Sequence, residues 1–222
     1  RNSTVRFLNW DDLSYRDLEI PLQFPHQVKR NILNPDEYFI FDYLGSFMKL
    51  NSVTKEYLLI DNKIERNFFQ GHGIQTRDGS KILSVESNFD NSVYALVVRS
   101  AVNLQKLDVV GTYSDMHHIL TLPDSTIAAY PAKAESTNLS GVYFYDYEKR
   151  KNVGVFDTEY NYPSHLSIAS PTEVLFPTIR DNLIPHKKLI LNNSVGENLA
   201  KLYDGSSAGR IGPSPIYRAS VN

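Results

Sequence analysis

The stretch "FFQGHGIQTRDGSKIL", residues 68–83, is the part of the sequence that decides the fold. A histidine between two glycines leads into a short apolar segment, an Asp-Gly turn and a second apolar segment. Asp-Gly between two apolar runs is a strong signal for a β-hairpin. By itself the stretch leaves three roles open for His72: a catalytic residue, a metal ligand, or a part of the backbone architecture.

The same pattern recurs along the chain at a nearly constant spacing. His72 follows His26 by 46 residues, His118 follows His72 by 46, and His165 follows His118 by 47. Each histidine precedes two apolar segments joined by a turn, and two further apolar segments complete the repeat. Pro213 stands in place of the histidine before the last apolar segment. A period of about 46 residues that holds four strands is typical of a β-propeller blade.

We therefore expect an all-β protein, a β-propeller with four-stranded blades that forms a single domain over residues 1–222. The aromatic share of 12% agrees with a strand-rich chain. A two-sheet sandwich is the alternative, but it does not predict equal spacing of the histidines that begin each repeat, here called the anchor histidines. The pattern is compatible with a compact five-bladed ring or with a section of a longer, seven-bladed propeller, and we favour the second. Trp10 should pack in the first, incomplete blade, and the final segment "GPSPIYRASV" should contain the first strand of another.

Composition excludes several classes of function. The formal net charge of −2 gives no electrostatic footprint for nucleic acid. No apolar run approaches the roughly 18 residues of a membrane span. The chain has no cysteine, which excludes disulfides, thiol catalysis and zinc–thiolate sites. The motifs of the serine-nucleophile elbow, the HExxH zinc proteases and the phosphate loops do not occur.

The segment "FQGHGIQTRDGSKILSVESNFDN" resembles an uncharacterised family of exported bacterial β-propellers that are often encoded beside imelysin-type iron-uptake proteins. The matching positions are Phe69, Gly71, His72, Gly73, Asp78, Gly79, Glu86, Asn88 and Asp90. The resemblance implies a propeller fold, a periplasmic or otherwise exported location, and a role in iron acquisition. Members of the family usually carry arginines where this chain has "DYLG", and they are longer than 222 residues.

The spacing of the histidines gives them a common place in the fold. The first strand of a blade lines the central channel, so residues just before equivalent first strands converge at one channel rim. Five of the six histidines belong to this position and form the predicted ligand site: His26, His72, His117, His118 and His165. Imidazoles without thiolates suit copper, zinc or iron.

Two interpretations of these histidines remain open. In the first, His72, His118 and His165 bind a transition metal ion, with Glu86 and Asp115 as acidic neighbours. In the second, each histidine hydrogen-bonds the backbone and ties neighbouring blades together, a role that a repeat inherits by duplication. Function has to be argued from the site and not from the fold.

We expect a non-enzymatic propeller that binds a protein partner or a small ligand at its channel face and takes part in periplasmic metal acquisition. The alternative is a metalloenzyme whose metal is held by the channel histidines. A propeller lyase or hydrolase is a third candidate, and it would need converging acidic residues that the sequence does not identify.

Overall fold

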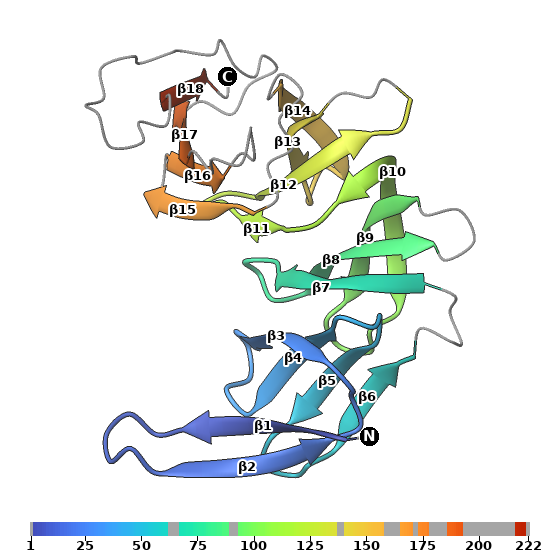
Figure 1. Ribbon diagram of the computed structural model, residues 1–222, viewed down its shortest axis with the longest axis vertical. Helices are drawn as coiled ribbons and strands as arrows, with labels where there is room; N and C mark the ends of the chain where they lie inside the picture. Colours follow the sequence, from blue (N-terminus) through green and yellow to red (C-terminus); the bar gives the residue numbers. More distant parts are fainter. Residues whose placement is uncertain are drawn as a thin grey trace.

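We describe a computed structural model of the chain over residues 2–61, 67–88, 93–136, 140–157, 165–170, 173–177, 186–192 and 216–220. Every regular element in these ranges is a β-strand, and the strands form successive sheets along an arc, antiparallel except for one pair in the last sheet (Figure 1). Among the described residues, no helix has the length and apolar character that crossing a bilayer requires.

The first two sheets come from the N-terminal 60 residues. A two-stranded sheet contains β1 (Ser3–Leu8) and β2 (Tyr15–Ile20). The first four-stranded blade contains β3 (Pro25–Arg30), β4 (Glu37–Asp42), β5 (Phe47–Asn51) and β6 (Tyr57–Ile60). Each strand pairs with the next in sequence, as the repeat predicts.

The second and third blades follow the same order. The second contains β7 (Asn67–Gln75), β8 (Lys81–Asn88), β9 (Tyr94–Ser100) and β10 (Lys106–Met116). The third contains β11 (Leu120–Thr121), β12 (Ile127–Ala134), β13 (Ser140–Asp146) and β14 (Lys151–Asp157). The end of β10 also pairs with β12, so these two blades share one continuous sheet.

The fourth sheet contains β15 (Ser167–Ser170), β16 (Glu173–Pro177), β17 (His186–Asn192) and β18 (Ile216–Ser220). The prediction that residues 216–220 begin a further blade is wrong, because β18 pairs in parallel with β17 in this sheet. The parallel pairing covers the hydrogen-bonding edge that β17 would otherwise expose.

The hydrophobic core lies between neighbouring sheets. Phe39, Phe41 and Phe47 of the first blade pack with Ile82 and Leu104 of the second. A larger cluster joins the second blade to the third, and it includes Tyr113 and Tyr130. Strands such as β13 are buried along their whole length because both of their faces are covered, which explains their continuous apolar sequence.

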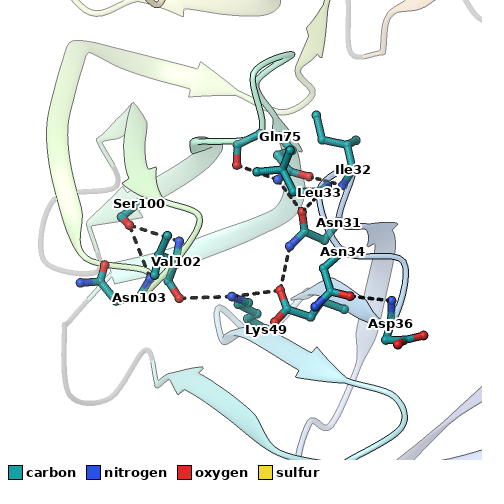
Figure 2. A network of polar contacts seen from close by, with 12 residues as sticks. Asn31, Ile32, Leu33, Asn34, Asp36, Lys49, Gln75, Ser100, Val102 and Asn103 are labelled. Atoms are coloured by element: carbon teal, nitrogen blue, oxygen red, sulfur yellow. Dashed lines mark hydrogen bonds and ion pairs between the residues drawn. The ribbon is translucent and has the colours of Figure 1, made fainter.

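A polar network also joins the first blade to the second (Figure 2). The Gln75 side chain accepts a hydrogen bond from the Ile32 backbone at 2.8 Å and donates one to Asn31 Oδ1 at 2.8 Å. Lys49 binds Glu37 at 3.0 Å and donates to the Val102 carbonyl at 3.3 Å. The Gln75 and Lys49–Val102 contacts cross between the two blades, whereas the Lys49–Glu37 ion pair lies within the first blade and positions the Lys49 side chain.

Trp10 departs from its expected place. It lies in the turn of the β1–β2 hairpin with 81% of its surface exposed, so the prediction that it packs in the first blade is wrong. Hairpin turns project from a sheet, and side chains there have few neighbours to pack against.

Candidate metal centre

The five histidines of the repeat lie on the inner strands of the blades or in the residues just before them. His26 is the second residue of β3, and His72 lies within β7. His117 and His118 occupy the loop before β11, and His165 precedes β15 by two residues. The expectation that each anchor precedes its strand is therefore wrong for His26 and His72.

β-Bulges explain the position of these two histidines. The register of β3 against β4 shifts between Pro25 and Gln27, and the register of β7 against β8 shifts between Phe69 and Gly73. A bulge allows pairing to continue past an extra residue while it changes the direction of a side chain. His26 and His72 lie inside these irregular segments.

His72 is the central member of the cluster. Its ring centroid lies 4.6 Å from that of His117, 4.8 Å from His26, 4.9 Å from His118 and 5.6 Å from His165. Only 6% of its surface is exposed. One buried imidazole therefore contacts four others contributed by neighbouring blades and by the loops that precede their inner strands.

Three of the five histidines form a compact set of nitrogen atoms. One ring nitrogen from each of His72, His117 and His165 lies within 4.8 Å of the other two. A tetrahedral ion with metal–nitrogen distances of about 2.0–2.1 Å needs ligand atoms roughly 3.3 Å apart. A movement of about 1 Å by half-buried or exposed side chains would close that difference. Three imidazoles leave a fourth coordination position open.

The two nitrogen atoms of His72 have different surroundings. Its Nε2 lies 3.3 Å from Nε2 of His26, whereas its Nδ1 is buried and has no hydrogen-bond partner among the residues that the structure describes. An unsatisfied buried polar atom costs about 1–3 kcal/mol. When Nε2–H donates to His26, Nδ1 keeps its lone pair and is suited to a metal ion, with His26 as the outer partner that fixes the tautomer.

His118 has a different role. Its Nδ1 accepts a hydrogen bond from the backbone N–H of Leu166 at 3.2 Å. A neutral imidazole that accepts through Nδ1 carries its proton on Nε2, which then has no lone pair for a metal. His118 therefore ties the third blade to the residues that lead into β15, which is the structural interpretation of the repeat histidines.

Burial disfavours the protonated form of four of the five histidines. It lowers the pKa of His72 to about 3, and the neighbouring imidazoles add to the effect by mutual repulsion. Burial followed by repulsion from His165 lowers the pKa of both His117 and His118 to about 4, and burial followed by repulsion from His26 lowers that of His165. Neutral imidazole is the form that binds metal, so these residues remain competent ligands at pH values where an ordinary histidine is protonated.

The acidic neighbours named from the sequence have other roles. Glu86 is buried, and its carboxylate accepts hydrogen bonds from Arg99 at 2.8 and 3.1 Å and from Ser84 at 2.8 Å. Asp115 lies in β10, where its charge adds to the effect of burial in raising the pKa of Tyr94. The compact set of potential ligands in the described chain contains imidazoles alone.

Sequence reasoning missed two residues beside the cluster. The ring of Tyr43 contacts His26 with the centroids 5.6 Å apart. Lys29 is close enough to His118 to contribute to its lowered pKa. The repeat could have indicated Lys29. This residue stands three positions after His26, and Gln75 stands three positions after His72.

Comparison with known proteins defines the class as a β-propeller. The WD40 repeats of RRP9 match with a TM-score of 0.57 and 11% identity over 74% of this chain and 48% of that one. An oligogalacturonate lyase in complex with manganese matches with a TM-score of 0.58 and 12% identity over 77% and 49%. The Cps50 (Swd1) β-propeller domain of Myceliophteria thermophila matches with a TM-score of 0.63 and 10% identity over 82% and 62%.

These likenesses concern the fold, since the identities are low, and the chain spans about half the length of the first structures it matches. No protein-family profile matches the sequence, and no curated protein matches it either.

Proposed function

We propose that this protein is a non-enzymatic binding propeller that holds a divalent transition metal ion on His72, His117 and His165. The observation that carries the proposal is the convergence of one nitrogen from each ring to within 4.8 Å of the others. Nδ1 of His72, which is buried without a hydrogen-bond partner among the described residues, supports it. His117 takes the place that the sequence suggested for His118, because His118 uses its Nδ1 to bind the backbone.

The chemistry of the ligand set restricts the metal. Neutral imidazoles suit zinc, copper, iron and nickel better than magnesium or calcium. The resemblance to exported propellers encoded beside iron-uptake proteins supports a periplasmic location and a role in metal acquisition. In that role the open coordination position and the channel face would receive a protein partner or a small ligand.

Metal analysis of the purified protein tests the proposal directly. After supplementation with zinc, copper or iron, we expect about one ion per chain by plasma mass spectrometry. His72→Ala, His117→Ala and His165→Ala should each lower affinity by about 100-fold or more, since each removes one of three ligands. His186→Ala is the matched control, because it removes the one histidine outside the cluster.

Two results would contradict the proposal. One is the absence of stoichiometric metal under every supplement. The other is an unchanged metal content in all three ligand variants while the variants keep the circular dichroism of the native protein.

A metalloenzyme is the second candidate function. The open coordination position favours it, as does the likeness of fold to an oligogalacturonate lyase in complex with manganese. A β-elimination on oligogalacturonate produces an unsaturated uronate that absorbs in the ultraviolet. If the manganese-loaded protein forms this product and His72→Ala does not, the protein is a lyase and the non-enzymatic binding function is wrong.

A further inference from the structure

A second candidate site lies at the other end of the inner strands. A cavity of about 430 Å³ is lined by the ends of β3, β7 and β11 and by the turns that follow them. Lys29, Gln75 and Thr121 occupy equivalent positions there, each three residues beyond an anchor histidine. The cavity therefore begins just beyond the histidine cluster, and Lys29 is the lining residue that lies close enough to His118 for its charge to act on it.

The walls of this cavity are held in place and are largely apolar. Gln75 donates to Asn31 and to the Gly79 carbonyl and accepts from the backbone of Ile32 (Figure 2). Ile32 itself lines the cavity together with Ile74, Leu122 and Pro123. A volume in the range of small-molecule pockets, with apolar walls and a few fixed polar groups, is typical of a ligand site.

The charge around the cavity is positive. Lys29, Arg30 and Arg77 line it, and Asp124 is the one acidic residue among the lining residues of the described chain. Asp124 forms an ion pair with Arg77 at 3.1 Å, with both side chains largely exposed. The charges of Arg77 and Asp124 therefore offset each other, and no described residue forms an ion pair with Lys29 or Arg30.

Lys29 has the clearest need of a partner. It is half-buried, and within the described part of the chain its ammonium group makes no hydrogen bond or ion pair. A buried or half-buried cation is normally paired, because removing it from water is costly. The Arg30 guanidinium, in contrast, donates to the Pro35 carbonyl at 2.9 Å.

We propose that this cavity, here called the channel pocket, binds a small organic carboxylate whose apolar body packs on Ile74, Leu122 and Pro123 and whose carboxylate pairs with Lys29. The apolar walls favour an organic body over a bare inorganic ion, and the unpaired ammonium supplies the charge. The site is distinct from the metal centre, and its occupation does not require a metal.

The test uses the full chain freed of metal on a chelating resin, so that a failure of the metal proposal leaves the result interpretable. The probes are phenylacetate and hexanoate, each compared with its neutral amide, and inorganic phosphate. Binding is measured by calorimetry and by ligand-observed NMR. We expect at least one of the two carboxylates to bind about tenfold more tightly than its amide, because only the carboxylate can form a charge-assisted hydrogen bond with Lys29.

Lys29→Met should weaken carboxylate binding about tenfold or more, and Lys29→Arg should retain most of it. Lys151→Met is the matched control, because it removes an exposed lysine from β14, away from the pocket. Equal carboxylate affinity in the native protein and Lys29→Met would overturn the proposal. So would the absence of carboxylate binding, or phosphate binding as tight as that of the carboxylates.

Discussion

His72 is a buried imidazole surrounded by four others, with one ring nitrogen unsatisfied. Placing a proton on this side chain would bury a charge beside rings that are themselves titratable. The metal-free protein therefore depends on the neutrality of the cluster, and its stability should report on that requirement.

We predict that the metal-free protein loses stability as the pH falls from about 6.5 towards 4. The pKa of His72 is lowered in the folded protein to about 3, so the unfolded chain binds more protons across this interval. The stabilising contribution is complete above the unfolded pKa and is lost as pH falls towards the folded one. A histidine in this condition makes the free energy of unfolding fall by up to about 1.4 kcal/mol per pH unit.

Urea denaturation at several pH values measures this slope. His72→Gln removes one of the four rings whose pKa is lowered and should make the profile less steep, whereas His186→Gln should leave it unchanged. The same slope in native protein and His72→Gln would show that burial of His72 does not contribute to acid stability.

At the scale of the strand, Gly73 allows the first two blades to approach closely. A Cβ added at this position would lie 2.2 Å from the ring of Phe41, far inside van der Waals contact. The Gly73 N–H also donates to Gln27 Oε1 at 2.9 Å, which links β7 to β3 next to the histidines. The glycine after His72 is thus explained by packing between blades.

We predict that Gly73→Ala destabilises the protein by about 1–3 kcal/mol, the usual cost of overpacking a core. It should also weaken metal binding, because the displaced strand carries His72. Phe41→Leu should relieve part of the clash, so the double variant is expected to be more stable than the sum of the single changes implies. Thermal denaturation of the four proteins measures the coupling, and strict additivity would count against this packing account.

The sequence predicted the strands and their grouping into blades better than it predicted bulges, hydrogen-bond partners and the packing of single residues. The anchor spacing predicted four-stranded blades and placed the histidines of successive blades at one end of the inner strands. The bulges at His26 and His72 were not predictable, because they depend on pairing with β4 and β8 across the blade. The hydrogen bond between His118 and the backbone was not predictable either, because its donor, Leu166, lies 48 residues further along the chain. Trp10 and β18 were misassigned because an apolar residue or a short apolar segment does not specify its neighbour.

At the scale of the whole molecule, the blades are joined mainly through contacts with their immediate neighbours. Three of the hydrophobic clusters join neighbouring sheets or blades, and the fourth joins the third blade to Leu166 just before β15. Stability in such repeat architectures is approximately a sum of local interfaces. The metal proposed here would act differently. His72 lies in the second blade, His117 in the loop leading to the third, and His165 in the residues leading to the fourth. One ion would therefore connect segments of three successive blades at once, across the two interfaces between them.

We predict that zinc stabilises the whole propeller against heat and that the gain depends on all three ligands. An ion present at 100 times its dissociation constant stabilises the folded state by about 2.7 kcal/mol. For a chain of this size that corresponds to an increase in Tm of roughly 5–10 °C. His117→Ala and His165→Ala should each remove most of the increase, and His186→Ala should keep it. Since Lys29→Met leaves the three ligands intact, it should also keep the increase.

A chelator should reverse the increase in Tm in native protein. Equal zinc-induced shifts in His117→Ala and native protein would mean that the ion binds elsewhere and does not connect the blades through this histidine.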